Sequence, residues 1–325
     1  MARKLFILYM VFVFLIIVSL LIGLRTLGLD SDFVSYSVYY ANIANNLSFS
    51  DTRYEPGFVL LSYVFKEILN VNIYVMLSFL AFISLVIKEF IFLKDKHSFL
   101  ITLIYLVGIG LLHEMTQIRV AVAVSFVLLA LYFESRGRYY LTFVLLILSI
   151  TFHYSMFFFT IGLIIPNNWL NNNKIRIPIV FLYAIIIAFV IYFIQGILID
   201  NIDMLRVYAS RADGETFNFI SVRFIGLAIP LLIGVFAFDK FSVFQKKCFI
   251  ISLAAYVLSI PTSLIPTLAS RLFELGWVCF YFWVPGIKPK NKRIVALVFL
   301  AFVSFYFAFR NIYLIPIFGN TNISN

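Results

Sequence analysis

Long apolar runs separated by short polar segments dominate the chain. The runs over 5–23, 71–93 and 177–199 match the roughly 20 residues that a helix needs to cross a bilayer. Short segments of alternating polarity, the pattern of a membrane β-barrel, are absent from the sequence. We therefore expect an all-α polytopic membrane protein, in which each helix satisfies its own backbone hydrogen bonds.

The positions of Lys and Arg predict which way these helices run, because cytoplasmic loops carry an excess of positive charge. Dividing the run 139–165 at His153 places every basic cluster on one side of the membrane. This predicts about ten transmembrane helices plus two short re-entrant or interfacial helical segments, over 57–70 and around His153. The basic clusters lie at 3–4, 94–96, 136–138, 174–176, 246–247 and 288–293.

The composition also indicates a membrane protein, and the charge distribution limits which binding partners are expected. Hydrophobic residues make up 63% of the chain and charged residues 12%, and the net charge of +10 lies in the basic clusters beside the runs. We expect the bilayer, and no nucleic acid, as a partner. Residues 1–325 are predicted to form a single integral membrane domain, with the first run retained and periplasmic loops near 28–56, 113–118 and 200–222.

A polar cluster interrupts the apolar pattern between 113 and 119. If this stretch is helical, His113, Gln117 and Ser125 share one face at four-residue spacing. Glu114 and Arg119 lie on the same turns. Because ionisable groups are costly inside a membrane, such a cluster indicates a water-filled cavity or a polar ligand. The simpler alternative is a loop that is polar without further function.

Acidic residues and tyrosines occur together in the predicted periplasmic loop near 28–56. Asp32, Tyr36 and Tyr40 are spaced by four along a short predicted helix, and Glu55 follows. Carboxylates accept hydrogen bonds from sugar hydroxyls and aromatic rings stack on sugar faces, which suits a sugar-binding role. An interfacial aromatic belt with helix-capping acids explains the same residues.

Arginines collect on this side against the usual charge bias. Arg119, Arg206, Arg211 and Arg271 would suit phosphate, because the guanidinium fork matches phosphate oxygens in two places. Pairing of the loop arginines with neighbouring carboxylates is the alternative. His153, or His113 with Glu114, has the chemistry of a general base near neutral pH. Neither a metal-ligand spacing nor a nucleotide-binding motif occurs, so no metal and no cofactor is expected.

The run 113–123 resembles the "Q-x-R-x-x-x-A" signature of the EpsG-type, Wzy-like polysaccharide polymerases, through Gln117, Arg119 and Ala123. The run 151–155, with Phe152, His153 and Ser155, is similar to the "F-H-x-S" run of that family. Asp30 or Asp32 with the tyrosines, and the segment 55–58, resemble its amino-terminal pattern. Val120 departs from the family, which often has a polar residue there.

The resemblance implies an O-antigen or surface polysaccharide polymerase, a multi-pass glycosyltransferase of the bacterial inner membrane. Such proteins join undecaprenyl-pyrophosphate-linked oligosaccharide units on the periplasmic face, for example during lipopolysaccharide biosynthesis, and a chain-length regulator protein is an implied partner. Three sets of roles follow from it. The catalytic residues would be His153, His113 and Glu114; the pyrophosphate-binding residues Arg119, Arg206, Arg211 and Arg271; the sugar-binding residues Asp32, Tyr36, Tyr40, Glu55 and Gln117.

Two other functions fit an all-α membrane protein. A lipid-linked oligosaccharide flippase or other transporter predicts internal repeats and charges near the membrane midplane, whereas no repeat is found and the polar residues gather on one side. A membrane O-acyltransferase of surface glycans would also use a base histidine. Its acyl donor approaches from the cytoplasmic side, which does not suit the predicted positions of His113 and His153.

Overall fold

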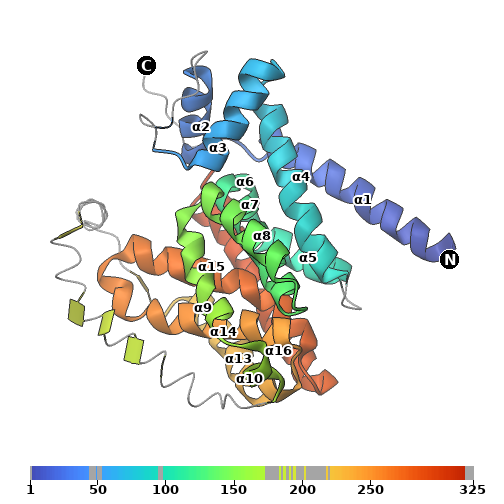
Figure 1. Ribbon diagram of the computed structural model, residues 1–325, viewed down its shortest axis with the longest axis vertical. Helices are drawn as coiled ribbons and strands as arrows, with labels where there is room; N and C mark the ends of the chain where they lie inside the picture. Colours follow the sequence, from blue (N-terminus) through green and yellow to red (C-terminus); the bar gives the residue numbers. More distant parts are fainter. Residues whose placement is uncertain are drawn as a thin grey trace. The chain divides into compact units, whose positions relative to one another are not determined.

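The computed structural model describes residues 2–43, 53–93, 98–172 and 220–318, with single positions in the intervals between them. Every regular element in these ranges is a helix, which confirms the all-α prediction (Figure 1). The chain divides into two compact units, one of Met1–Phe158 with Phe307–Asn325 and one of Phe159–Tyr306.

The first unit begins with a long helix and a group of short ones. They are α1 (Ala2–Gly23), α2 (Ser31–Ala41), α3 (Pro56–Tyr63), the π-helix η1 (Val64–Ile68) and α4 (Ile73–Phe92). Side chains before the helices fix where two of them start. Asp30 accepts hydrogen bonds from the backbone N–H groups of Asp32 and Phe33, and Asn72 accepts one from Val75 at the start of α4.

Helix breaks shape the rest of this unit. The apolar run near 99–112 is not one helix, because α5 (Ser98–Val107) and α6 (Ile109–Met115) meet at Gly108 with a bend of 71°. A second break at Thr116 and Gln117 precedes α7 (Ile118–Glu134). The prediction that His113, Gln117 and Ser125 share one helical face is therefore wrong, since His113 lies on α6 and Ser125 on α7.

The predicted division of the run 139–165 is confirmed at His153. Helix α8 (Tyr139–Phe152) ends just before it, and His153 itself is extended, with φ −163° and ψ 122°. A 3-10 helix, η2 (Tyr154–Phe159), follows. The extended residue turns the chain away from the axis of α8. The membrane depth of these segments stays a prediction.

The second unit packs its helices around large aromatic side chains. Trp277 and Trp283 on α15 and Phe249 on α14 are fully buried, and a Cβ at Gly276 would lie 2.3 Å from the Ala255 Cβ, so the two helices are in close contact. Its elements are α9 (Thr160–Ile164), α10 (Asn167–Asn171), α13 (Val222–Ala237), η3 (Phe238–Lys240), α14 (Val243–Leu258), η4 (Pro261–Leu264), α15 (Pro266–Trp283), η5 (Val284–Gly286) and most of α16 (Lys290–Phe309). The end of α16 from Phe307 on, and the π-helix η6 (Arg310–Leu314), belong to the first unit.

Two lysines used above to orient the helices are internal. Lys246 donates to the Leu170 carbonyl (2.7 Å), and Lys247 donates to the carbonyls of Gly162 and Ile165 (3.0 and 3.1 Å). Both side chains are buried. They cap the carboxyl ends of α9 and α10, where the helix dipole favours a positive charge. Their place in the sequence therefore reflects packing as well as membrane topology.

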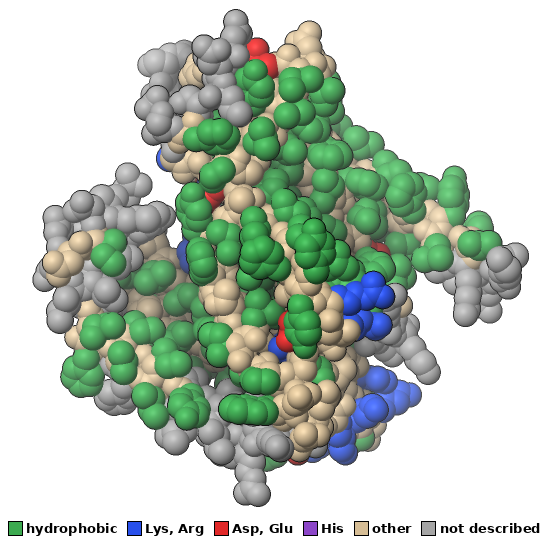
Figure 2. Space-filling view, in the orientation of Figure 1, with side chains coloured by type: hydrophobic (Ala, Val, Ile, Leu, Met, Phe, Trp, Pro, Cys, Tyr) green, Lys and Arg blue, Asp and Glu red, His purple; other side chains and the backbone are tan. Residues whose placement is uncertain are grey.

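Three helical segments in the described residues are long and apolar enough to cross a membrane: Ile73–Phe92, Val222–Lys240 and Lys290–Leu314. The bent pair α5 and α6 adds a fourth if it counts as one span. Large apolar side chains cover much of the face in Figure 2, and Phe143, Phe236 and Phe305 are all more than half exposed. A chain with such a surface is membrane-embedded. The predicted count of about ten spans stays a prediction.

Candidate active site

The Glu55 carboxylate joins two of the predicted site residues in the first unit. Its Oε1 atom lies 2.5 Å from His153 Nδ1, and its Oε2 atom forms an ion pair with Arg119 Nη1. Along the chain, Glu55 is 64 residues from Arg119 and 98 residues from His153. The fold thus assembles one His–Glu–Arg cluster from the amino-terminal segment and the two sequence motifs.

Local structure explains how Glu55 reaches this position. Glu55 directly precedes α3, and Pro56 occupies the first helical position, where its missing N–H is not needed. Gly57 then allows α3 to approach the end of α8, because a Cβ there would lie 2.8 Å from the Thr151 carbonyl oxygen. This close approach places Glu55 beside His153, which follows α8.

Arg119 lies in the first turn of α7 against a bed of aromatic rings. Its guanidinium carbon is 5.5 Å, 4.7 Å and 5.8 Å from the ring centroids of Tyr36, Tyr54 and Phe58. Its Nε also donates a hydrogen bond to the Tyr36 hydroxyl (3.4 Å). Such cation–π contacts hold the guanidinium in one orientation while leaving its outer face accessible.

A second guanidinium shares this aromatic bed. Arg53 is 5.2 Å from the centroid of the Tyr54 ring and donates to the Tyr54 hydroxyl (3.1 Å). That hydroxyl in turn donates to the Ser35 carbonyl on α2 (2.9 Å), which fixes the ring. Arg53 is exposed, so Tyr54 has one half-buried arginine, Arg119, and one exposed arginine beside it.

The charges around Glu55 favour its ionised form. Burial alone would raise the pKa of the Glu55 carboxyl, but the hydrogen bond to His153 and the charge of Arg119 outweigh burial and lower this pKa. Burial raises the pKa of Tyr36 to about 12 in spite of Arg119, so its hydroxyl stays neutral at physiological pH. The cluster then offers a fixed carboxylate, a phenol and a cation.

Arg119 and His153 remain open to a ligand. Their side chains are 20% and 21% exposed, whereas Glu55 is 6% exposed. A carboxylate bound to one ring nitrogen of a histidine orients the ring and determines which nitrogen faces the ligand. The arrangement can therefore accept a proton at His153 and bind an anion at Arg119.

The other half of the predicted polar cluster lies in a separate, buried network. Glu114 is fully buried and forms an ion pair with Lys88 of α4 (2.8 Å). His113 is also fully buried, on α6. Gln117 is half-buried at the break before α7. The structure thus separates Glu114 from Arg119, although only five positions divide them in the sequence.

The predicted sugar-binding residues of α2 have different surroundings. Tyr36 contacts Arg119, as described above. Tyr40 donates its hydroxyl to the Val71 carbonyl (2.7 Å) and so holds α2 to the segment before α4. Asp32 lies in the first turn of α2 and is half-buried.

The structure brings together only part of the predicted set of arginines. Arg206 and Arg211 lie outside the described residues. Arg271 is exposed on α15, in the second unit. Arg53, which is not among the predicted site residues, shares the Tyr54 ring with Arg119 instead.

Lys88 and Tyr54 were not singled out by the sequence pattern. A signal for Lys88 was present, because an ionisable residue inside the apolar run 71–93 marks a functional or paired position. Tyr54 carried no such signal, since tyrosines are frequent along this chain and its ring acquires a role only through the fold.

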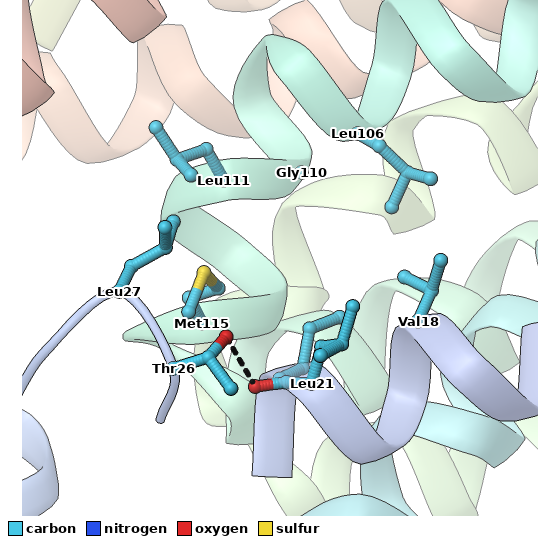
Figure 3. A pocket seen from close by; sticks show the side chains of 9 residues that line it. Val18, Leu21, Thr26, Leu27, Leu106, Gly110, Leu111 and Met115 are labelled. Carbon is cyan, nitrogen blue, oxygen red and sulfur yellow. Dashed lines mark hydrogen bonds between the residues drawn. The ribbon is translucent and has the colours of Figure 1, made fainter. Parts of the chain in front are cut away.

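An apolar cavity of about 210 Å³ opens between the end of α1 and the bend of α5 and α6 (Figure 3). The hydroxyl of Thr26, its one hydroxyl-bearing lining side chain, donates to the Leu21 carbonyl (3.1 Å). The cavity therefore presents hydrocarbon to an occupant. Its lining residues are Val18, Leu21, Ile22, Thr26, Leu27, Leu106, Gly110, Leu111 and Met115.

The described residues thus form a helical, membrane-embedded protein with a His–Glu–Arg cluster partly open to a ligand. The sequence comparison is more specific. The chain belongs to the EpsG family, a Wzy-like polymerase family, whose sequence model matches residues 7–324. No curated protein and no solved structure matches the chain.

Proposed function

We propose that this protein is a polysaccharide polymerase of the bacterial inner membrane. It joins undecaprenyl-pyrophosphate-linked oligosaccharide units on the periplasmic face during O-antigen or other surface polysaccharide biosynthesis. The observation that carries the proposal is the Glu55 carboxylate, which binds His153 on one oxygen and Arg119 on the other. Membership of the EpsG family supports the same reaction class.

His153 is the proposed base. A hydroxyl of the acceptor sugar attacks the anomeric carbon of the donor chain, and a new C–O bond forms as its proton passes to His153. Glu55 orients the imidazole through Nδ1 (2.5 Å) and stabilises the imidazolium that results. His113 with Glu114, the other predicted base, is fully buried, so His153 is the better placed of the two.

Arg119 is the proposed electrophilic partner. The bond from the anomeric carbon to the phosphate oxygen breaks, and undecaprenyl pyrophosphate leaves with the bonding electrons. A guanidinium next to this oxygen stabilises the developing charge. Arg53 adds a second positive charge beside Tyr54, and Arg206, Arg211 and Arg271 remain proposed contributors from elsewhere in the chain.

The sugars of the two substrates would contact the residues around this centre. Tyr36 and Tyr54 provide aromatic faces beside Arg119, and the half-buried Asp32 and Gln117 provide hydrogen-bonding groups. Tyr40 contributes mainly by holding α2, because its hydroxyl is bound to Val71. A chain-length regulator protein remains a proposed partner, and about ten spans a proposed topology.

The apolar cavity suits the isoprenoid part of the same lipid. Met115 lines the cavity and Arg119 follows four residues later, so their Cα atoms are at most about 15 Å apart. One lipid can therefore place its hydrocarbon in the cavity and its pyrophosphate near Arg119.

Replacing Arg119 by Ala tests the proposal in the cell. In a strain lacking the gene, we expect the wild-type protein to restore a ladder of long surface glycans and R119A to leave only single-unit products. R138A is a matched control, because Arg138 is exposed before α8 and away from the cluster; it should restore the ladder.

The same strain separates the alternative functions. Loss of every surface glycan on deletion would indicate a flippase, and long glycans that lack only acyl groups would indicate an acyltransferase. Long chains produced by R119A at the wild-type level would contradict the role given to Arg119.

A further inference from the structure

A buried ammonium group spans the helix break that precedes Arg119. Lys88 Nζ on α4 donates to Glu114 Oε1 on α6 (2.8 Å) and to the Ala121 carbonyl on α7 (3.0 Å). The Lys88 and Glu114 side chains are 1% and 0% exposed. One side chain therefore holds the chain on both sides of the break at Thr116 and Gln117.

Hydroxyl groups complete this arrangement. The same Glu114 oxygen accepts hydrogen bonds from Tyr105 on α5 (2.8 Å) and Ser84 on α4 (2.9 Å). Ser125 on α7 accepts one from Lys88 (2.7 Å) and donates to the Ala121 carbonyl (2.8 Å). Four helices are thus joined at a single ion pair.

An ion pair in this position is costly because both charges lose their contact with water, so the pair depends on the hydrogen bonds around it. In Glu114 all of them converge on Oε1, while Oε2 is buried without a hydrogen-bond partner in the described structure. Such an ion pair fixes one arrangement of the helices around it, since any shift leaves a charge without partners. The Ala121 carbonyl accepts a hydrogen bond from Lys88. Ala121 lies two residues after Arg119, near the start of α7. The direction in which the Arg119 side chain points from α7 therefore depends on the ion pair.

We propose that Lys88 and Glu114 form a clamp that positions Arg119 for the departing pyrophosphate. The catalytic role of the clamp rests on the proposed function. Glu114 is then a positioning residue, which acts through Arg119 and does not touch the substrate. The clamp explains why a fully buried carboxylate lies so close in sequence to the half-buried Arg119.

E114Q tests the clamp, with E89Q as a matched control. Glu89 follows Lys88 on the same helix, is 3% exposed, and accepts its hydrogen bond from Thr102 of α5. The same chemical change is thus made at two buried carboxylates, and only one of them lies at the α6–α7 break. The first readout is the rate at which phenylglyoxal modifies Arg119 in the purified protein, followed by peptide mass spectrometry.

We expect the modification rate at Arg119 to rise about threefold or more in E114Q, because the guanidinium leaves its aromatic bed. The rate in E89Q should equal that of the wild type. In a polymerisation assay, kcat of E114Q should fall about 10²-fold with KM little changed, as for a displaced catalytic group. E89Q should keep its kcat.

An E114Q protein that is folded and monodisperse but has the wild-type modification rate at Arg119 would overturn the clamp. If E114Q does not fold, S125A is judged by the same criterion, because it removes the hydrogen bond between Lys88 and Ser125 on α7. Modification needs no enzymatic activity. An altered rate in E114Q together with a wild-type protein that makes no polymer would support the clamp and refute the proposed function.

Discussion

At the scale of single residues, the account depends on one carboxylate shared by an imidazole and a guanidinium. Glu55 is nearly buried, and each of its oxygens has a different partner. His153 and Arg119 keep about a fifth of their side-chain surface exposed, so chemistry can take place at their outer faces. The same residue therefore joins two distant segments of the chain and, in the proposed mechanism, orients the two groups that would meet the substrate.

Replacing Glu55 by Gln should reduce both activity and stability. Losing the orienting carboxylate should lower kcat by about 10²- to 10⁴-fold, the range for a disrupted general base. Losing two charge-assisted hydrogen bonds should lower the free energy of unfolding at pH 7 by about 1–3 kcal/mol. Thermal unfolding in detergent and a polymerisation assay measure the two effects.

The stability that Glu55 contributes should decrease at acidic pH. Folding lowers the Glu55 pKa, so its stabilising contribution is complete above the ordinary value of 4.5 and is lost as the pH falls through the lower folded-state value. The difference in melting temperature between wild type and E55Q should thus shrink as the pH falls below 4.5. A difference that grows as the pH falls below 4.5 would contradict the Glu55 assignment.

At the scale of helices, function is concentrated where helices end. Glu55 precedes α3, Arg119 follows the break before α7, and His153 follows α8. Backbone groups at helix ends lack intrahelical partners, and the chain direction changes there, so side chains from distant segments can converge. The bend at Gly108 belongs to the same pattern, because it opens the apolar cavity beside α1.

The sequence predicted these elements unequally. The break at His153 was predicted from the charge bias of cytoplasmic loops, because dividing the run 139–165 there places every basic cluster on one side of the membrane. The break before α7 did not follow from the pattern, because four-residue spacing across 113–125 also fits one continuous helix. The burial of Lys246 and Lys247 could not be predicted from the pattern either, because their acceptors are carbonyl groups of short helices far away in the sequence.

The candidate site was predictable as a set of residues and not as a geometry. Arg119 and His153 stand out through polarity in apolar surroundings, and Glu55 through its place next to Pro56. Which carboxylate joins them depends on the contact of α3 with α8 at Gly57, a long-range contact that periodicity does not encode. For the same reason the pairing of Glu114 with Lys88 was not foreseen.

Filling the cavity tests the place proposed for the lipid chain. V18W adds a large ring to a lining position on α1, and we expect KM for the lipid-linked substrate to rise about tenfold with kcat changed less, because uniform binding is lost. L20W is a matched control on the same helix, since Leu20 is 47% exposed and does not line the cavity. Equal effects of the two substitutions would contradict this place for the lipid.

At the scale of the whole molecule, the chain is a membrane-embedded, all-helical member of the EpsG family. Apolar side chains cover much of its visible surface (Figure 2). Among the described residues, the buried Glu55 pairs with Arg119 and the buried Glu114 with Lys88, as expected where an unpaired charge is costly. In the proposed function, a lipid-linked substrate would reach the site from the bilayer, with its energy already stored in the pyrophosphate ester.

The most direct measurement is polymerisation by the purified protein. Wild-type protein in liposomes would be given a single substrate, an oligosaccharide repeat unit linked to undecaprenyl pyrophosphate. We predict a ladder of glycan lengths and one released undecaprenyl pyrophosphate for each bond formed, with both products lost in H153A and R119A. Transfer of the intact lipid across the liposome membrane without any ladder or release would contradict the account.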